Sequence, residues 1–482
     1  MCQYPHPIRL VYGFTLTSCF LFSESFHVCS QEWTFRKPVM PLSLQHKFIR
    51  WRPKSSPIVP SSRRCDPVQI FPLEIVWMIF HHLLDADKNC WHIRRLISLV
   101  SKSWRNAVYT NPLFWQFIKF DLGLFTQAYL RVLNNQIIRS QDVPLFVTIS
   151  SATDPPDQRK EFPIAALDSI FFQSSRIRVL SIKFPLSHMH WKPNVKGRFS
   201  HLEKLKLNRS RSDFMFYIFD NMSPMQLTYL ALVNVSISMK KIHNILAACR
   251  NLESIRIIFG FGERLVRPPH YLLLPKLRCL TLGGQCYLPD ILSCLRAPNL
   301  SSLAISHSIY MPFWFSSLNS LLLQTKFLKE LTLYGAITDS ERSLINMLKH
   351  CSRLTRLFIR NPAPDSLIED ETFRLLTRQQ GSGCALLPDL EQLVIVKGIR
   401  IEDHRVIVDM IKSRSLKRSL SGPQLHPPEL KELKFVELDE CERMPLRMIR
   451  KVGRICRKRG VMVAGSFVGL NAKTNWAAFE YS

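Results

Sequence analysis

The chain lacks the residue patterns that hold metals or perform covalent chemistry. Its 13 cysteines include no Cys-x-x-Cys pair, and its 15 histidines include no helical i, i+4 pair with a glutamate between them. A zinc site needs closely spaced ligands that fix a tetrahedron, so the sequence predicts no bound metal and no cofactor. The stretch Gly381-Ser382-Gly383-Cys384 lacks the Lys-Ser/Thr ending of a phosphate-binding loop. The sequence shows no recognisable arrangement of a nucleophile and a general base, so we expect a protein that is not an enzyme.

Long apolar runs are missing as well. The longest near the start, residues 8–22, is broken by Arg9 and hydroxyl residues, and a membrane span needs about 20 apolar residues. Scattered cysteines without a disulfide pattern favour a reducing compartment, so we expect a cytoplasmic or nuclear protein without a membrane span. The alternative of an extracellular receptor, in which residues 1–25 are a cleaved signal peptide, remains open. Met40 offers a second start, which leaves open whether residues 1–39 belong to the mature protein.

Acidic residues are scarce relative to basic ones. The chain has 37 Asp and Glu against 65 Lys and Arg, a formal net charge of +28. Such a charge attracts polyanions, namely nucleic acid, acidic lipid or acidic protein segments. General surface solubility explains the excess equally well, so charge alone does not identify a partner.

What the chain does contain is a repeat. Five times, at a spacing of 25 residues, an aliphatic residue is followed by two variable positions, a second aliphatic, one variable position and a third. A fixed period of this length predicts a solenoid, in which each unit buries its apolar side against its neighbours. The five copies are Ile177-Leu180-Ile182, Leu202-Leu205-Leu207, Leu227-Leu230-Leu232, Leu252-Ile255-Ile257 and Leu277-Leu280-Leu282.

The pattern continues with looser spacing to the C-terminus. Alternation at Leu145, Val147 and Ile149 predicts a strand that forms the first layer of the solenoid. Short outer helices are expected at 239–248, 291–295 and 344–348, so each unit has one strand and one helix. We place the solenoid at residues 142–470 and a tail at 471–482. The later copies are Leu300-Leu303-Ile305, Leu328-Leu331-Leu333, Leu354-Leu357-Ile359, Leu390-Leu393-Ile395 and Leu430-Leu433-Phe435.

The N-terminal part has a different organisation. Residues 1–65 end in a stretch rich in proline, serine and basic residues, which predicts a poorly ordered extension. Two amphipathic helices follow, the second with apolar residues from Ile93 through Ile97 to Trp104. Asn111-Pro112 ends this run. We place a small helical domain at 66–118 and a connecting helix at 119–141.

Residues of this helical domain match a known motif. The chain reads Phe71-Pro72-Leu73-Glu74-Ile75, then Ile79-Phe80, then Leu99-Val100-Ser101-Lys102-Ser103-Trp104-Arg105, and closes with Pro112-Leu113-Phe114-Trp115. This order resembles the F-box, although Phe71 replaces the usual leucine and one extra residue precedes Trp115. The resemblance implies that the domain binds a Skp-type adaptor and, through it, a cullin. The residues that it assigns to adaptor binding are Pro72, Leu73, Ile75, Ile79, Phe80, Leu83, Val100 and Trp104.

The repeats resemble leucine-rich repeats. The family's Asn or Cys after the last leucine is mostly missing, which casts doubt on a regular hydrogen-bonded ladder. The order of F-box, alternating strand and loose repeats resembles the F-box proteins abundant in mushroom-forming fungi. The expected fold is therefore α+β, a small three-helix F-box followed by a curved leucine-rich solenoid.

The variable positions between the leucines predict the exposed face of the sheet. Basic groups beside aromatics there suit an acidic or phosphorylated protein segment. The same residues would also suit binding to single-stranded nucleic acid. A third explanation is that the exposed face is polar for solubility alone. The predicted target-binding residues are Lys183, Lys204, Lys206, Tyr229, Arg256, Tyr334, Arg356, Phe358 and Arg360.

The segment 447–459 predicts a basic helix with an apolar stripe at Met448, Val452 and Ile455. We expect the last outer helix, which closes the solenoid; nuclear import or binding to an anionic membrane is the alternative. Taken together, the sequence predicts the substrate-recognition subunit of an SCF-type ubiquitin ligase. The alternative is a basic solenoid that binds nucleic acid and acts as a scaffold outside any ligase.

Overall fold

The computed structural model describes residues 67–464, except 87–89, 125, 152–160, 184–197, 210–216, 236, 260–270, 285–287, 308–313, 336–339, 361–367, 378–385, 397–398, 415–430 and 440–445. These residues belong to the unit Asp66–Ser482. The predicted extension at 1–65, the loop at 381–383 and the tail at 471–482 lie outside the described residues.

The first part of this unit is helical. It contains α2 (Pro67–Ile70), α3 (Leu73–Ala86), α4 (Cys90–Val100), α5 (Lys102–Thr110) and the 3-10 turn η2 (Pro112–Trp115). We call residues 67–115 the helical module. Its core contains Val76, Phe80, Ile97, Ala107, Val108, Phe114 and Trp115.

The prediction of one helix through Ile93 and Trp104 was wrong, because the chain forms α4 and α5 there. Ser101 separates them with an extended backbone (φ −155°, ψ 170°), and its Oγ accepts a hydrogen bond from the backbone N of Trp104 at 3.1 Å. A serine that caps the N-terminus of a new helix cannot at the same time continue the old one. The predicted break at Asn111-Pro112 is confirmed, because Asn111 caps η2 through Leu113 N.

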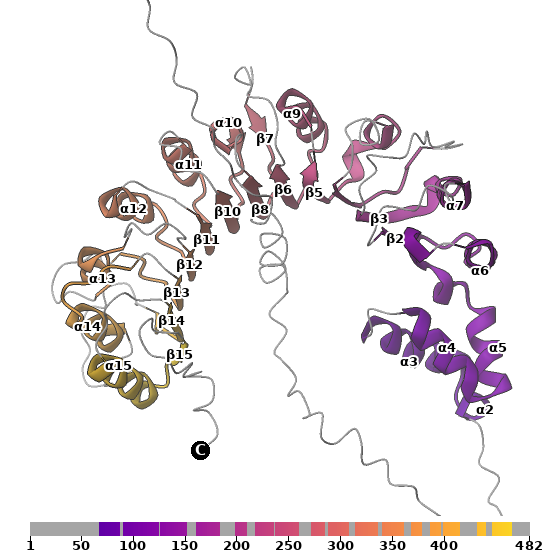
Figure 1. Cartoon of the computed structure of the whole chain (residues 1–482), viewed down its shortest axis with the longest axis horizontal. Helices are drawn as coiled ribbons and strands as arrows, with labels where there is room; N and C mark the ends of the chain where they lie inside the picture. The colour runs from indigo at the N-terminus through magenta and orange to yellow at the C-terminus, as the bar shows by residue number, and fades with distance from the viewer. Residues whose placement is uncertain are drawn as a thin grey trace, which may run out of the picture. The chain divides into compact units, whose positions relative to one another are not determined.

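The rest of the unit is built on one parallel sheet of 13 strands (Figure 1). Every strand pairs with the next copy in parallel, because each strand, turn and helix brings the chain back to the same edge. The described helices of the repeats lie along the outer side of the sheet (Figure 1), and we call the strands' other face the inner face. The strands are β1 (Phe117–Asp121), β2 (Leu145–Ser150), β3 (Ile177–Lys183), β4 (Lys204–Asn208), β5 (Tyr229–Val235), β6 (Ser254–Phe259), β8 (Cys279–Gly284), β10 (Ser302–His307), β11 (Glu330–Tyr334), β12 (Arg356–Arg360), β13 (Gln392–Val396), β14 (Phe435–Asp439) and β15 (Met462–Ala464).

Outer helices and turns connect these strands. The predicted helix at 239–248 is confirmed, whereas the helices predicted at 291–295 and 344–348 each begin three residues earlier. The longer elements are α6 (Gln127–Arg139), α7 (Glu161–Phe171), α9 (Met239–Ala248), α10 (Leu288–Cys294), α11 (Trp314–Leu322), α12 (Glu341–Leu348), α13 (Asp370–Leu376), α14 (Arg405–Arg414) and α15 (Leu446–Arg459). The short ones are η3 (Leu122–Leu124), η5 (Ser174–Arg176), η7 (Pro224–Gln226), β7 (Leu272–Leu273) and β9 (Leu295–Arg296), of which β7 pairs with β9.

The aliphatic repeat positions form continuous rows through the core. Leu205 pairs in register with Leu230, then Ile255, then Leu280, and each is at most 2% exposed. Full burial of one such side chain contributes roughly 1.5–3 kcal/mol, so the rows account for much of the solenoid's stability. The repeat predicted from the leucine spacing is therefore confirmed at the level of strand pairing.

Two predicted positions differ from the structure. The strand at Leu145 is not the first layer, because β1 precedes it and pairs with it, Ile118 opposite Val147. In the last predicted repeat the frame was three residues early. Pairing with β13 places Val436 opposite Leu393 and Leu438 opposite Ile395, so that Phe435 faces away from the core. Both frames contain aliphatic residues at the required spacing, and only the pairing distinguishes them.

Neighbouring repeats are also joined by hydrogen bonds from polar side chains at the strand entrances. Thr228 Oγ1 donates to the Glu203 carbonyl at 3.2 Å, Ser301 Oγ to Arg278 at 3.0 Å, and Thr355 Oγ1 to Lys329 at 3.0 Å. The Asn or Cys residues that form a hydrogen-bonded ladder after the last leucine are mostly missing from this sequence. The hydrogen bonds at the strand entrances are a partial counterpart of that ladder, at the other end of the strands.

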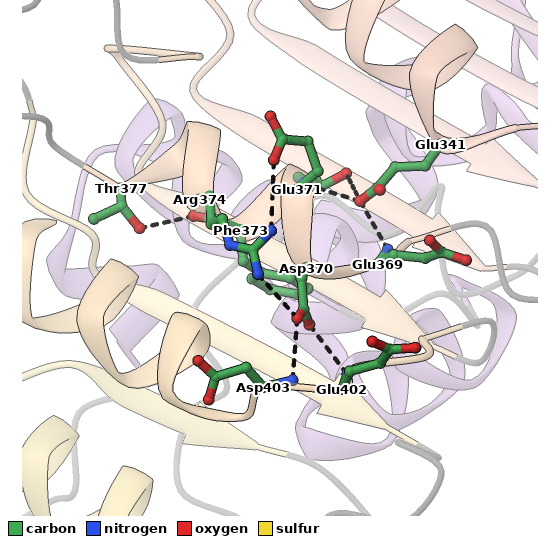
Figure 2. A network of polar contacts seen from close by, with 10 residues as sticks. Glu341, Glu369, Asp370, Glu371, Phe373, Arg374, Thr377, Glu402 and Asp403 are labelled. Carbon is green, nitrogen blue, oxygen red and sulfur yellow. Dashed lines mark hydrogen bonds and ion pairs between the residues drawn. The ribbon is translucent and has the colours of Figure 1, made fainter.

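Carboxylates link successive outer helices near the C-terminal end (Figure 2). Glu341, in the first turn of α12, accepts hydrogen bonds from the backbone N of Glu369 and from the N and Oγ1 of Thr372, at 2.6–2.8 Å. Asp370, in the first turn of α13, accepts from Glu402 N and Asp403 N at 3.1 and 3.0 Å. Each helix start thereby satisfies amide groups at the start of the next unit.

Candidate functional site

The helical module separates its apolar residues into an inner and an outer set. Phe80 is 1% exposed and lies 4.8 Å from the Trp104 ring and 5.9 Å from the Phe114 ring, centroid to centroid. Phe80 therefore packs the core and is not available to an adaptor, contrary to the prediction. Trp104 is half-buried against the same cluster. The carbonyl of Pro72, an exposed residue, accepts the first helical hydrogen bonds of α3 from Ile75 N and Val76 N.

The outer set is unusually apolar. Of the predicted adaptor-binding residues, Leu73, Ile75, Ile79 and Val100 are 37–60% exposed, whereas the side chain of Leu83 lies outside the described part. Neighbouring helices α3 and α4 add exposed side chains that the motif did not identify: Met78, Leu96 and Leu99. Their signal was present in the sequence, because a helix with apolar residues on both faces has more of them than one core can bury.

The module is bonded to the first strand of the sheet. Arg94 Nη2 donates to the Phe117 carbonyl at 3.3 Å, and Gln136 Nε2, from α6, donates to the same carbonyl at 2.6 Å and to Trp115 at 3.4 Å. The Arg139 guanidinium lies 4.8 Å from the Trp115 ring centroid. We call these contacts the joint; they tie the module's last turn to the first layer of the solenoid.

The inner face of the sheet is strongly basic at β3–β6. The register places Lys204 beside Tyr229, Lys206 beside Ala231 and then Arg256, and Lys183 beside Asn208. Partial burial and the nearby charges of Lys183, Lys204 and Arg256 all lower the pKa of Lys206. Its ammonium lies 5.1 Å from the centre of the Tyr229 ring. The structure thus brings together five of the predicted target-binding residues.

The predicted residues further along the sheet have a different environment. Arg356 forms an ion pair with Glu330, which also accepts a hydrogen bond from Ser302 Oγ. The Arg360 guanidinium lies 5.0 Å from the centre of the Tyr334 ring, and Phe358 is half-buried between Thr332 and Val394. The positive charge of Arg356 is therefore compensated within the protein, which the sequence pattern did not indicate.

The last outer helix, α15, presents a second basic surface. Val452 and Cys456 are buried and Ile455 packs against the core, so the predicted apolar stripe faces inward at these positions. Met448's side chain lies outside the described part. Seven exposed basic residues cover the rest of the helix: Arg447, Arg450, Lys451, Arg454, Arg457, Lys458 and Arg459.

The described residues contain no group of three His, Cys, Asp or Glu side chains close enough to hold a metal ion. In the same part of the chain, no helix has the length and apolar character to cross a membrane. Burial raises the pKa of Cys249, Cys351 and Cys456 to about 12, which disfavours the reactive thiolate form. The described part of the chain thus has an exposed apolar surface on the helical module and basic surfaces on the repeats, and the joint contacts connect the module to the first strand.

Comparison with known proteins supports the repeats. Residues 177–318 match a family model described as "FBD-associated F-box protein At5g56370, LRR repeats". No curated protein matches the chain. The match covers the five regular repeats and the strand after them, and it ends within α11. The chain therefore contains leucine-rich repeats similar to those of an F-box-associated family.

Proposed function

We propose that this protein is the substrate-recognition subunit of an SCF-type cullin-RING ubiquitin ligase. In this function the helical module is an F-box that binds a Skp-type adaptor, and through it a cullin, while the inner face of the repeats binds a target protein. The observation that carries the proposal is the exposed apolar surface of α3 and α4 on a module that already has a complete core. A soluble protein rarely exposes such a surface without a partner.

The proposed role requires no catalytic residue in this chain. A receptor of this kind raises the effective concentration of the target beside a ubiquitin carrier, and the chemistry belongs to the other subunits. The joint supports this role, because a receptor that holds its target at a fixed position must transmit that position to the adaptor. In this role the protein would act in the cytoplasm or nucleus.

Capture of a recombinant Skp-type adaptor tests the proposal. The variants Ile79→Asp and Val100→Asp place a charge in the proposed interface, and we expect each to weaken capture roughly hundredfold or more because the carboxylate is buried without a partner. Leu323→Asp is the matched control, since Leu323 is exposed to a similar degree, 59% against 48% for Ile79, but belongs to the repeats. Absence of adaptor binding by the unmodified protein, or equal loss in the control, would contradict the proposal.

A second function is favoured by α15. Seven exposed basic residues on one helix, with no acidic residue in it, suit the phosphates of a nucleic acid. Insertion of this helix into a membrane is disfavoured, because Val452 and Cys456 on its apolar side already pack in the core. Binding of duplex or single-stranded DNA or RNA can be measured over a range of salt concentrations. Binding that weakens steeply with salt, and that is lost in Arg450→Ala/Arg454→Ala, would support a nucleic-acid scaffold over the ligase receptor.

A further inference from the structure

The exposed apolar side chains of the repeats gather at one edge of the sheet. Parallel strands in neighbouring repeats all begin at the same edge. We call the segments that lead into β5, β6, β8, β10, β11 and β12 the entrance edge, namely residues 225–228, 249–253, 271–278, 295–301, 323–329 and 349–355. From β4 to β14, every large apolar side chain that is exposed among the described residues lies in these segments. They are Met225 before β5, Tyr271 and Leu273 before β8, and Leu323 and Phe327 before β11, with 48–71% of their surface exposed.

Backbone contacts hold these segments side by side. Asn251 Nδ2 donates to the carbonyl of Met225 at 2.5 Å, which joins the entrances of β5 and β6. Leu273 lies opposite Arg296 in the pairing of β7 with β9, which joins the entrances of β8 and β10. Because adjacent strands lie about 4.8 Å apart, the row from β5 to β11 is about 20 Å long.

The entrance edge is also strongly basic. Its segments contain one acidic residue, Glu253, against eight lysines and arginines. Two of the arginines lie over the exposed aromatic rings: the Arg296 guanidinium is 4.3 Å from the centre of the Tyr271 ring, and the Arg353 guanidinium is 5.2 Å from that of Phe327. Arg296 is half-buried and the other seven cations are exposed. The eight are Arg250, Lys276, Arg278, Arg296, Lys326, Lys329, Lys349 and Arg353.

This combination indicates the kind of partner that covers the edge. Apolar side chains exposed at neighbouring positions commonly mark an interaction site. A second copy of the chain is a poor partner, because each copy has a net charge of +28 and presents the same cations. Tyr271 is 71% exposed, and Leu273 and Leu323 are each 59% exposed, so these side chains protrude from the surface. Protruding apolar groups surrounded by cations suit the headgroup region of an anionic bilayer.

We infer that the entrance edge docks this protein on an anionic membrane surface. The apolar side chains enter the boundary between headgroups and acyl chains, and the lysines and arginines contact lipid phosphates. Tyr271 suits this boundary, because its ring is apolar and its hydroxyl group stays hydrated. Such docking is peripheral and needs no membrane span. It is independent of the proposed function, since neither the adaptor surface nor the inner face takes part.

Nucleic acid fits the same edge less well. Bases stack on aromatic faces, but only two of the five exposed side chains are aromatic, and an arginine lies over each ring. Leu273 and Leu323 offer no ring for stacking, so nucleic acid would leave their exposure unexplained. On α15, by contrast, the described exposed side chains are all basic. The two surfaces therefore suit different anions.

Co-sedimentation of the purified full-length protein with vesicles tests the inference. Vesicles of phosphatidylcholine alone are compared with vesicles of equal parts phosphatidylcholine and phosphatidylserine. We expect the mixed vesicles to bind at least about tenfold more tightly, because each lysine or arginine near an anionic surface contributes roughly a fivefold factor. Added salt should weaken this binding without abolishing it, since salt screens charges but not the apolar contacts.

Two double substitutions separate the apolar and electrostatic contributions. Leu273→Ser/Leu323→Ser keeps every charge, and we expect it to weaken binding to the mixed vesicles roughly tenfold or more, because two apolar groups no longer enter the bilayer. Lys276→Ala/Lys326→Ala keeps every exposed apolar residue of the edge and should weaken the same binding roughly twentyfold.

Control variants come from other surfaces of the repeats. Met462→Ser removes an apolar side chain of similar exposure, 56%, from β15. Arg450→Ala/Arg454→Ala removes two exposed cations from α15. Both should bind the mixed vesicles within about twofold of the unmodified protein. All of these side chains are exposed, so we expect each variant to unfold at the temperature of the unmodified protein.

Reduced binding in both edge variants, with both controls unchanged, would support the inference. Absent binding to either kind of vesicle, or equal binding to the two, would overturn it. Full binding by Leu273→Ser/Leu323→Ser would also overturn it, because another partner must then cover the apolar side chains. If the α15 variant lost as much affinity as Lys276→Ala/Lys326→Ala, the attraction would come from net charge and the edge would not be a docking site.

Discussion

Adjacent residues of the same chemical type have opposite roles in the helical module. Ile79 is 48% exposed and Phe80 is 1% exposed, although both match the motif that implies adaptor binding. The difference arises because successive residues on a helix point about 100° apart. Phe80 points toward Trp104 and Phe114, so its contribution is to stability, whereas the side chain of Ile79 is available to a partner.

Truncation of these two residues should therefore have different effects. We expect Phe80→Ala to destabilise the helical module by about 3–5 kcal/mol, because it leaves a cavity in a small core. Ile79→Ala should change stability by less than about 0.5 kcal/mol. Urea unfolding followed by tryptophan fluorescence measures both, since Trp104 and Trp115 lie in or against this core. An equal loss of stability in the two variants would contradict the assignment.

Arginines on the inner face show the same dependence on surroundings. Arg356 and Arg256 occupy variable positions of different repeats, and their neighbours in register differ: Glu330 lies opposite Arg356 and pairs with it, whereas Ala231 lies opposite Arg256. Residue type at a repeat position thus indicates which face a side chain occupies, but its electrostatic state depends on the neighbouring strand.

Single capping residues determine where several elements begin. Ser101 ends α4 and starts α5, and Asn111 starts η2. At the other end of the chain, caps come from distant residues: Glu341 reaches the start of α13 (Figure 2). Thr372, one of its donors, is only 2% exposed, so its amide depends on Glu341 for a partner.

Loss of the Glu341 carboxylate should destabilise α13. We expect Glu341→Ala to reduce the free energy of unfolding by about 1–3 kcal/mol, because the buried Thr372 amide loses its hydrogen bond. Hydrogen exchange at α13 should accelerate. Glu371→Ala is the control: its carboxylate forms an ion pair with the exposed Arg374 at 3.7 Å, and such surface pairs contribute about 0–1 kcal/mol. Unchanged exchange at Thr372 in Glu341→Ala would show that the cap is dispensable.

At the scale of the whole molecule, the joint connects the proposed adaptor surface to the proposed target surface. Trp115 closes the core of the helical module, and β1 starts two residues later at Phe117. Gln136 bonds to both carbonyls from α6, so the module's last turn is held by a helix of the solenoid.

Removal of the Gln136 amide should loosen this connection. We expect Gln136→Ala to cost about 1–3 kcal/mol, since it leaves two carbonyls without this donor in a buried setting. Hydrogen exchange and limited proteolysis should increase at residues 111–121, with little change in the repeats beyond β3. Gln127→Ala, an exposed residue on the same helix, should have no effect. Faster exchange throughout the solenoid would indicate a global role for Gln136 instead.

Most of the repeat architecture was predictable from local periodicity. The spacing of Leu205, Leu230 and Ile255 identified the core rows, because a strand's faces alternate with a period of two residues and each repeat places its strand beside the last. Where two frames were equally apolar, at Leu433 to Leu438, the sequence could not choose, since the choice depends on pairing with β13, about 40 residues earlier.

The amino-acid pattern by itself determined that strands repeat, which residues face inward and where basic side chains gather on the exposed face. Only the tertiary structure decided which apolar residues of the helical module are buried, that Arg356 pairs with Glu330, and how Gln136 joins the two parts. The reason is physical: periodicity is a property of the local backbone, whereas burial and charge compensation depend on side chains brought together from repeats distant in sequence.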